Sequence, residues 1–369
     1  GMSRDMPARQ AILVLGMHRS GTSALAAALQ AVGVALGDDL LVPGDDNPGG
    51  YFEHAAAVTA HEALLAELGR GWDDLRPLPA GWCQSAAGER AASSLAQVIS
   101  QSFGQAALWA VKDPRLCRVL PLWRALLPAA RVDARYLMVI RHPDEVAASL
   151  ARRNAFPLEY GHLLWLLYVL EAERDSRDGV RCVVTYDALL ADPAATLRRV
   201  GRELGVAWPL APDAAGLSAL LDPGRRHHRA GGTDAAGGAI RAGSIALYEA
   251  LASVDAATGW PDLQDASDRL QAWRTRHGPW LDAAGTALAS ARLDALEGAR
   301  AQRRLASALE RVEALSLSRM HDLEVLDSRL KASDDALVRA ETHVRAAQRD
   351  SQELDARLQE ADRALEGAK

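Results

Sequence analysis

The chain contains very little lysine. Its 369 residues include many arginines but only three lysines, at Lys112, Lys331 and Lys369. Lysine and arginine are not interchangeable at a reacting centre, because the ammonium group is a compact point charge and guanidinium is a planar fork. Lys112 is the one lysine in the part of the chain that we expect to be globular, and it lies at the end of an apolar run. It is therefore a candidate functional residue, the alternative being chance survival in an arginine-rich chain.

Cysteine, net positive charge and long apolar runs are also scarce. The three cysteines are far apart and form no Cys-x-x-Cys pair, which argues against a disulfide framework or a zinc site. The net charge of −6 argues against general nucleic-acid binding, which needs a basic surface. No apolar run approaches the ~20 residues that cross a bilayer, and no signal-peptide pattern precedes the first apolar segment. We expect a cytoplasmic protein, with attachment to the inner membrane surface left open.

Short apolar runs alternate with helical patterns along the first 200 residues. This alternation is typical of an α/β domain with a parallel sheet. The expected strands cover residues 12–15, 108–111, 136–140 and 182–185. The expected helices cover residues 21–31, 53–68, 89–103, 116–127, 143–153, 163–173 and 193–204. We therefore predict a three-layer, P-loop-like parallel sheet flanked by helices.

The loop after the first expected strand is the most informative segment. An apolar run ends at Gly16, and an alanine-rich helical pattern begins after Gly21. The N-terminus of a helix offers unpaired N–H groups and a positive dipole end, and so favours anions such as phosphate. The glycine spacing is that of a P-loop, but Thr22 stands where nucleotide triphosphatases have lysine. With Arg19 and Ser23 as further donors, the loop predicts a phosphate-like ligand without ordinary ATPase chemistry.

Two more strand ends should meet this loop, because ligands of doubly wound sheets bind outside the carboxyl ends of the strands. One carries Lys112, and the other carries Arg141-His142-Pro143 with Ser149 two helical turns further on. An arginine at a strand end and a hydroxyl on the following helix are able to hold a second phosphate. The alternative is structural: Arg141 pairs with a carboxylate, and Ser149 has no ligand.

Together these segments resemble the sulfotransferases that use 3′-phosphoadenosine 5′-phosphosulfate (PAPS). Residues 16–23 resemble the family's 5′-phosphosulfate loop in an arginine-containing form, and Arg141 with Ser149 matches its 3′-phosphate motif. Residues 47–53 and 112–115 are similar to bacterial members. Tyr186 opens a segment that is similar to the family's Tyr-Glu-Asp-Leu sequence. This chain departs from that sequence at Ala188, where the family has an acidic residue. The resemblance covers residues 10–230.

The resemblance implies a reaction and a set of donor ligands. The expected reaction moves a sulfuryl group from PAPS to a hydroxyl of a carbohydrate, glycolipid or small metabolite by in-line transfer, without a metal. Positioning and charge stabilisation dominate such transfers. The expected donor-binding residues are Arg19, Ser20, Gly21, Thr22, Ser23, Arg141, Ser149 and Tyr186.

The resemblance also implies catalytic roles. Arg19 and the loop N–H groups are expected to stabilise charge on the bridging oxygen of the leaving nucleotide, with Lys112 as the other candidate. Family members use a glutamate or a histidine to take the proton of the acceptor. Glu53 is the first candidate because it follows a glycine-rich loop and opens an expected helix, where the dipole alone also favours a carboxylate. The alternative bases are His18, His54 and His61.

The last third of the chain has a different texture. The basic segment 225–229 and the glycines after it predict a mobile loop, which closes over the 3′-phosphate or an anionic acceptor or is simply solvated. Residues 245–281 suggest two or three short helices. The expected parts are a sulfotransferase-like α/β domain (10–230), a Gly-rich loop with accessory helices (231–284) and a coiled coil (285–369).

A seven-residue apolar repeat supports that last part. One heptad position carries Leu309, Leu323, Leu330, Leu337, Val344, Leu358 and Leu365. The complementary position carries Leu305, Val312, Leu326, Ala340, Ala347, Leu354 and Ala361. A repeat sustained this long predicts a coiled coil, although Ser316, Arg319, Ser333 and Ser351 weaken its seam. We expect a homodimer or a partner protein there.

Two other functions fit part of this pattern. A P-loop kinase of a small metabolite is disfavoured by Thr22 and by the lack of a strand-end aspartate for magnesium other than Asp113. In the second alternative the α/β domain binds nucleotide only, and the coiled coil supplies a scaffold function.

Overall fold

A computed structural model describes residues 9–44, 49–221 and 238–366 of the chain. The basic segment 225–229 and residues 47 and 48 of the motif 47–53 lie outside the described residues. The chain divides into two compact units, Gly1–Ala291 and Arg292–Lys369.

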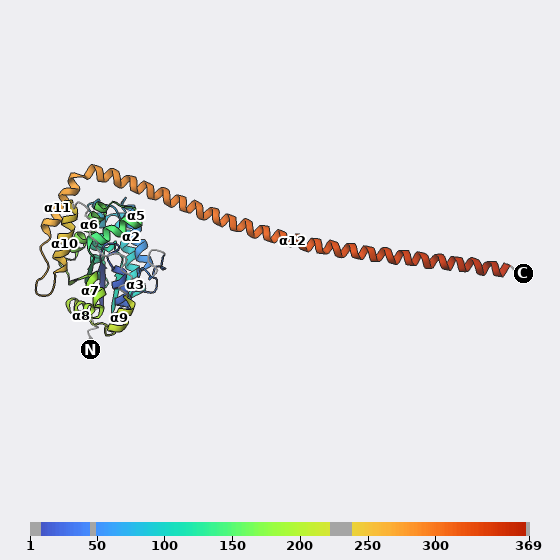
Figure 1. Ribbon diagram of the computed structural model, residues 1–369, viewed down its shortest axis with the longest axis horizontal. Helices are drawn as coiled ribbons and strands as arrows, with labels where there is room; N and C mark the ends of the chain where they lie inside the picture. The colour runs from blue at the N-terminus through green and yellow to red at the C-terminus, as the bar shows by residue number, and fades with distance from the viewer. Residues whose placement is uncertain (1–8, 45–48, 222–237, 367–369) are drawn as a thin grey trace. The chain divides into compact units, whose positions relative to one another are not determined.

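A four-stranded parallel sheet forms the centre of the first unit (Figure 1). In chain order the strands are β1 (Arg9–Leu15), β2 (Leu108–Lys112), β3 (Val132–Ile140) and β4 (Arg181–Thr185). Their spatial order is β2-β1-β3-β4, so that Ile12 of β1 lies beside Ala110 of β2 and Arg135 of β3. All four strands therefore end at the same edge of the sheet. The predicted α/β class with a parallel sheet is confirmed.

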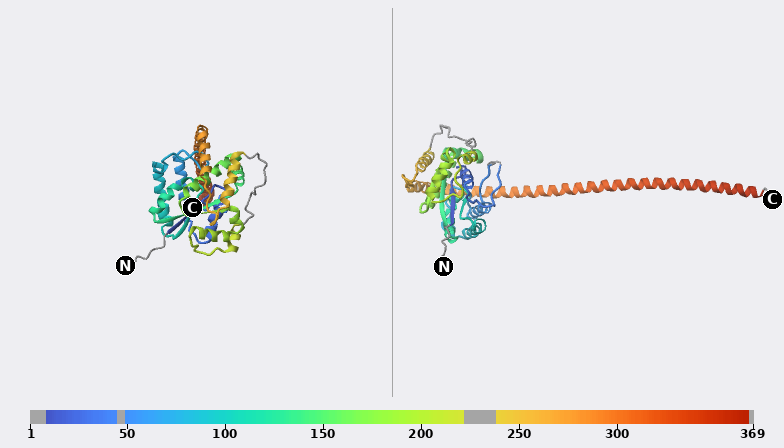
Figure 2. Two further views of the ribbon diagram at one scale, coloured as in Figure 1. Left: turned by 90° about the vertical axis from the view of Figure 1, so that its left-hand side faces the viewer. Right: turned by 90° about the horizontal axis from the view of Figure 1, so that it is seen from below.

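Helices cover both faces of this sheet (Figures 1 and 2). Because side chains alternate along a strand, Ile12 and Val14 enter one core cluster and Leu13 and Leu15 the other. The first cluster is completed by α1 (Thr22–Ala31), α8 (Pro193–Leu204) and α9 (Ala214–Leu220). The second, larger cluster is completed by α2 (Ala55–Glu67), α3 (Ala86–Phe103), α4 (Leu116–Ala129), α5 (Pro143–Asn154), α6 (Leu158–Ser176) and α10 (Ala239–Ala252). The result is a three-layer arrangement.

Some elements differ from the expectation. The helix expected over 163–173 spans Leu158–Ser176, because Pro157 caps it and nearly all of its faces are buried. Three short elements were not anticipated: η1 (Trp82–Gln84), α7 (Tyr186–Ala191) and α9. The accessory region holds α10 and α11 (Gln264–Arg276).

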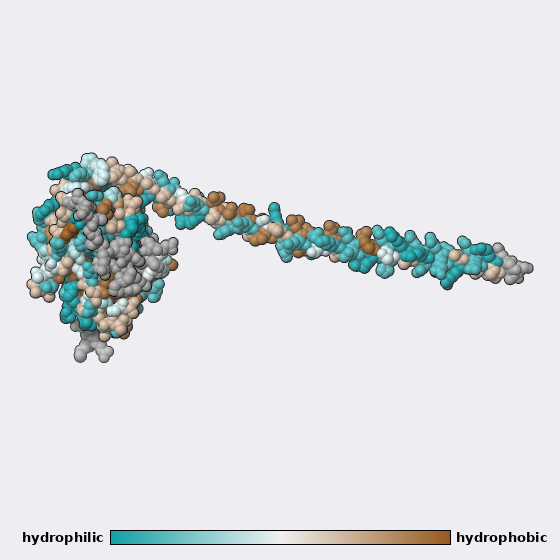
Figure 3. Space-filling view, in the orientation of Figure 1, coloured by the Kyte–Doolittle hydropathy of each residue, from teal (hydrophilic) through white to brown (hydrophobic). Residues whose placement is uncertain are grey.

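A single long helix, α12 (Gly278–Glu366), replaces the last accessory helix and the separate tail. Within the first unit its opening turns are anchored, because Leu281 is buried and the Arg76 guanidinium lies against Gly285. In the second unit, the apolar side chains of α12 are exposed and appear as brown patches along it (Figure 3). Among the described residues, no helix is long and apolar enough to cross a membrane.

Candidate active site

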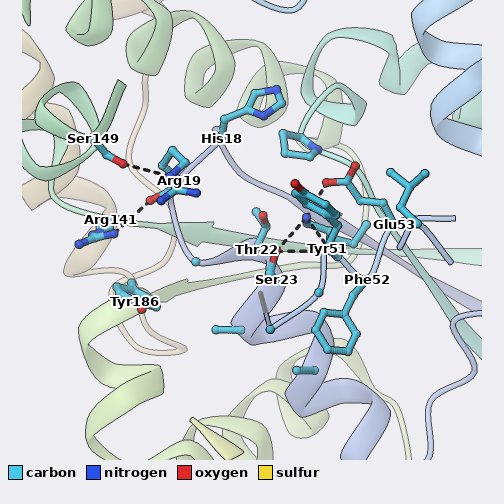
Figure 4. Close-up of a pocket in the computed structure, with 18 of the residues that line it drawn as sticks. His18, Arg19, Thr22, Ser23, Tyr51, Phe52, Glu53, Arg141, Ser149 and Tyr186 are labelled. Atoms are coloured by element: carbon cyan, nitrogen blue, oxygen red, sulfur yellow. Dashed lines mark hydrogen bonds and ion pairs between the residues drawn. The ribbon is translucent and has the colours of Figure 1, made fainter. Parts of the chain in front are cut away.

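A pocket of about 610 Å³ opens at the carboxyl edge of the sheet (Figure 4). Every strand end contributes to its lining: the loop after β1, Lys112 at the end of β2, Arg141 after β3 and Tyr186 after β4. Ligands of open α/β sheets bind at this edge, where the strand order reverses on either side of β1. The fold thus brings the segments chosen from the sequence into one cavity.

The loop after β1 has a backbone that only glycine fits at two points. A Cβ atom on Gly16 would lie 2.8 Å from the carbonyl oxygen of Val139. Gly21 has a φ of 93°, and a Cβ atom there would overlap the ring of Tyr186. Arg19 has a φ of 69°, an uncommon value for a residue with a side chain. The loop thus lies tightly against β3 and against Tyr186, the first residue of α7 (Tyr186–Ala191).

The N-terminus of α1 lines this pocket with residues 21–24. Gly21 is its N-cap, no side chain caps it, and its first turn has no acidic residue. The buried hydroxyl of Ser20 has no hydrogen-bond partner among the described residues. Donors left in this way suit an anion, because the helix dipole adds to their attraction.

One end of the pocket gathers two arginines and a hydroxyl. Arg19 Nε donates to Ser149 Oγ over 3.0 Å, and Arg141 donates to the Arg19 carbonyl oxygen over 3.3 Å. Arg141 also pairs with Glu145 at 2.6 Å, and its Cζ lies 4.9 Å from the Tyr186 ring centroid. The carboxylate pairing foreseen as an alternative for Arg141 is thus present, while its side chain still lines the pocket. We call this cluster of Arg19, Arg141, Ser149 and Tyr186 the arginine end.

The opposite end is built around Lys112, which is almost fully buried. Its Nζ donates to Glu53 Oε1 over 2.6 Å, to the Tyr51 carbonyl oxygen over 2.9 Å and to Ser23 Oγ over 3.1 Å. Burial lowers the pKa of Lys112 in spite of Glu53, and burial raises the pKa of Glu53 in spite of Lys112. Figure 4 shows Glu53 and Tyr51 across the pocket from Arg141 and Tyr186. We call the cluster of Lys112, Glu53, Ser23 and the Tyr51 carbonyl the lysine end.

The expectation that Glu53 opens a helix is wrong. Helix α2 starts at Ala55, and His54 is its N-cap. The reason is the extended backbone of His54, whose Nδ1 accepts from the Ala57 N–H. Glu53 is therefore held by Lys112 and by the backbone of the preceding segment rather than by a helix dipole.

Two of the histidines considered as bases have other partners. His54 Nε2 is hydrogen-bonded to Ser102 Oγ at 2.9 Å. His61 is fully buried; its Nδ1 lies 2.7 Å from Asp113 Oδ2, and its Nε2 accepts from the Trp123 indole over 2.9 Å. With both ring nitrogens of each histidine engaged, neither is available to an acceptor.

His18 differs from them because it lines the pocket. Its ring centroid lies 4.5 Å from that of Trp72, and its buried Nε2 has no hydrogen-bond partner among the described residues. Burial, and then the charge of Arg115, lower its pKa well below the usual value. The surroundings of His18 thus favour the neutral form of its imidazole.

Asp113 and Arg115 form a buried ion pair beside the lysine end. Arg115 donates to Asp113 Oδ1 over 2.9 Å, and its other amino group donates to Glu62 Oε1 over 2.7 Å. Burial alone would raise the pKa of Asp113, but Arg115 and His61 hold it well below its usual value. Asp113 is thus a structural anion with both oxygens occupied.

Four features of the lining were not predicted from sequence: Arg153, Glu62, the Tyr51 carbonyl and the contacts of Arg115. Arg153 follows Ser149 by four positions on α5, a spacing that would have found it. The Tyr51 carbonyl, Glu62 and the role of Arg115 carried no such signal. Among the described residues, no group of three or more His, Cys, Asp or Glu side chains is placed to hold a metal ion.

The fold and the pocket together define an α/β protein with a parallel sheet and a pocket lined by cationic and hydroxyl side chains at its carboxyl edge. The sequence pattern of the sulfotransferase family matches residues 11–209, which is more than half of the chain. The chain therefore belongs to the sulfotransferase family, as the resemblance of its motifs predicted. A search of curated protein sequences finds no match.

Three solved structures are similar to this chain. The sulfotransferase domain of the olefin synthase from Synechococcus PCC 7002 is 18% identical, with a TM-score of 0.39 over 67% of this chain and 98% of that one. The sulfotransferase domain from the curacin biosynthetic pathway is 15% identical, with a TM-score of 0.36 over 66% and 99%. A sulfotransferase from Alicyclobacillus acidocaldarius is 16% identical, with a TM-score of 0.38 over 68% and 98%.

Proposed function

We propose that this sulfotransferase takes its sulfuryl group from PAPS and transfers it to a hydroxyl of a carbohydrate, glycolipid or small metabolite. One observation carries the proposal: a single pocket holds an arginine end and a lysine end, with the uncapped start of α1 among the residues that line it. A donor with phosphate groups at two positions needs two cationic contacts. An acceptor that must lose a proton needs a carboxylate or imidazole nearby.

The arginine end suits the 3′-phosphate and the nucleoside. Arg141 and Ser149 offer a guanidinium and a hydroxyl to a phosphate, while Tyr186 offers an aromatic face. The start of α1, with Ser20 and Thr22, suits the 5′-phosphosulfate, because the buried Ser20 hydroxyl would gain an acceptor there. The fit needs no metal ligand.

The lysine end suits the chemical step. Arg19 is directed to Ser149, whereas Lys112 lies beside Ser23 and Glu53. We therefore assign Lys112, together with the N–H groups of the loop, to the bridging oxygen of the leaving nucleotide. Arg19 then serves the phosphate groups of the donor.

Glu53 is the proposed general base. The acceptor oxygen forms a bond to sulfur while the bond between sulfur and the bridging oxygen breaks. Glu53 takes the acceptor's proton, and the bridging oxygen keeps the electron pair, stabilised by Lys112. A carboxyl with a raised pKa is a better base than an ordinary one.

The kinase alternative has less support. Asp113 was its one candidate for a magnesium ligand, and its two oxygens already accept from His61 and Arg115. Rearranging this buried cluster for a metal ion would break two charged hydrogen bonds.

Calorimetry with the full chain tests the donor. We expect adenosine 3′,5′-bisphosphate to bind without magnesium and at least about tenfold more tightly than ATP, because each charged hydrogen bond to the 3′-phosphate is worth about 1.5–3 kcal/mol. Equal or tighter binding of ATP would overturn the proposal. Transfer from ³⁵S-labelled PAPS to a panel of hydroxyl compounds then tests the reaction itself.

A further inference from the structure

Arg115 lines the lysine end of the pocket and is surrounded by three carboxylates. Its NH1 lies 2.9 Å from Asp113 Oδ1 and 4.0 Å from Glu53 Oε2. Its NH2 donates to Glu62 Oε1 over 2.7 Å. The positive charge of Arg115 is therefore already balanced before any acceptor enters.

The three carboxylates differ in accessibility. The side chains of Asp113 and Glu53 are 0% and 9% exposed, whereas that of Glu62 is 58% exposed. Glu62 lines the pocket from α2. It is the partner of Arg115 that an incoming molecule meets first, and its loss would leave the buried pair of Arg115 and Asp113 intact.

The neighbouring cation is balanced as well. Lys112 lies 2.6 Å from Glu53 and gives its other hydrogen bonds to Ser23 and to the Tyr51 carbonyl. An anionic group entering the lysine end would have to displace one of these carboxylates or lie beside it. A hydroxyl compound without negative charge neither displaces a carboxylate from its cation nor is repelled by it. Its hydroxyls are able to donate hydrogen bonds to the carboxylates.

We propose that Glu62 is a specificity residue that keeps Arg115 closed to anions, so that the acceptor is a neutral or cationic hydroxyl compound rather than an acidic one. The assignment of this end to the acceptor rests on the proposed function. The charge balance of Arg115 is a property of the described residues themselves. The proposal narrows the acceptor class from carbohydrates and metabolites in general to those without carboxylate or phosphate groups next to the reacting hydroxyl.

A pair of probes that differ by one carboxylate tests this. Calorimetry measures binding of 4-nitrophenyl β-glucoside and 4-nitrophenyl β-glucuronide to the full chain, with and without saturating adenosine 3′,5′-bisphosphate. The wild type should bind the glucuronide more weakly than the glucoside. Glu62→Gln should strengthen glucuronide binding about tenfold relative to the glucoside, because it removes the negative charge beside Arg115 although its amide oxygen still accepts a hydrogen bond. Glu62→Ala should do the same.

Glu67→Gln is the matched control, since Glu67 is an exposed glutamate of the same helix whose partner is Arg90 and which does not line the pocket. Its ratio of affinities should equal that of the wild type. The proposal is overturned if both Glu62 variants leave glucuronide binding unchanged, if Glu67→Gln changes the ratio equally, or if the wild type prefers the glucuronide. Failure to bind adenosine 3′,5′-bisphosphate would count against the proposed function alone, since the glucuronide measurement without nucleotide still reports on Arg115.

Discussion

At the residue scale, two cations from neighbouring strand ends serve different parts of the pocket. Arg19 is directed to Ser149 at the arginine end, while Lys112 is buried against Glu53 at the lysine end. A guanidinium suits phosphate oxygens in a plane, and a buried ammonium suits a single oxygen that gains charge. The chain has few lysines, and Lys112 lies where a compact positive charge suits a single oxygen.

Substitutions at the two ends should separate binding from turnover. Lys112→Met should lower kcat about 100- to 1,000-fold, as for other lost stabilisers of a developing oxyanion, with the Kd of adenosine 3′,5′-bisphosphate changed less than about threefold. Arg141→Ala should raise that Kd roughly 10- to 100-fold. Labelled-sulfate assays and calorimetry measure the two quantities. The control is Lys331→Met, which removes an exposed lysine of the second unit. If Lys112→Met and Arg141→Ala exchange phenotypes, the assignment of roles is wrong.

The pH profile should report on Glu53. Burial raises the pKa of its carboxyl against the opposing effect of Lys112, and the base must be deprotonated to act. Activity should therefore fall as the pH drops through this raised pKa, at a higher pH than for an ordinary glutamate. Lys112→Gln removes the opposing charge, so the acid limb of kcat should move to still higher pH.

Glu53→Gln supplies the control for this profile. It should lower kcat strongly and remove the acid limb, because the amide does not titrate. An acid limb that keeps its position in both variants would assign the titrating group elsewhere, with His18 as the next residue to test.

The place of some residues in the lining of the pocket was predictable from the strand ends that they follow or occupy. Arg141, Ser149 and Lys112 follow directly from the rule that ligands bind beyond the carboxyl ends of strands. The contact between Glu53 and Lys112 was not predictable, because it depends on the loop before α2, including Phe52 with a φ of 57°. No short-range pattern encodes such a loop, and the sequence predicts for Glu53 a helix position that it does not occupy.

At the scale of elements, the unit of β1, its loop and α1 positions the proposed anion site. Gly21→Ala introduces a Cβ at a positive φ and against the Tyr186 ring. We expect it to lower the free energy of unfolding by about 1–3 kcal/mol and to weaken adenosine 3′,5′-bisphosphate binding more than about tenfold, because the loop and Tyr186 move apart. Urea unfolding and calorimetry measure these effects.

Gly243→Ala is the matched control, since Gly243 lies within α10 and a Cβ there meets nothing within 4 Å. It should raise the free energy of unfolding by about 0.5–1 kcal/mol, as expected for Gly to Ala inside a helix, and leave binding unchanged. Binding by Gly21→Ala within twofold of the wild type would contradict a role for this loop geometry.

The strand positions were predictable because their apolar runs are buried on both faces. The first residues of the strands were predicted less well. Strand β3 begins at Val132, four residues before the expected start. The expectation missed these residues because Asp133 is exposed, Ala134 and Arg135 are partly exposed, and the three interrupt the apolar run. Parallel pairing with β1 extends the strand through these three residues. Periodicity thus finds the buried part of an element, and hydrogen bonding to a neighbour decides its ends.

At the scale of the whole molecule, every described residue that lines the pocket lies in the first unit, whereas the described part of the second is helical. Within Arg292–Lys369 the heptad residues remain exposed on a single chain, with Leu309 at 59% and Leu323 at 65%. Isolated helices gain little stability from propensity alone, so such an exposed apolar stripe predicts a partner that would cover it. We infer a parallel homodimer through this segment, the commonest arrangement for a heptad repeat.

Truncation after Ala291 should separate assembly from binding. Leu281 is buried in the core of the first unit and Gly285 lies against Arg76, so a truncation before these residues would remove packing contacts. A chain that ends at Ala291 keeps them. Sedimentation velocity should show a dimer for the full chain and a monomer for the truncated one. Calorimetry should give the same Kd for adenosine 3′,5′-bisphosphate within about twofold, because every described residue that lines the pocket precedes the cut.

The full-length double variant Leu323→Glu, Leu330→Glu tests the apolar heptad seam without shortening the chain. Both side chains are exposed and share one heptad position, so charges there should abolish the dimer without affecting the first unit. A truncated chain that still dimerises would place the contact on the first unit instead. If the folded monomer binds nucleotide but has lost all sulfuryl transfer, dimerisation is required for the reaction. The long helix would then contribute to activity and not only to assembly.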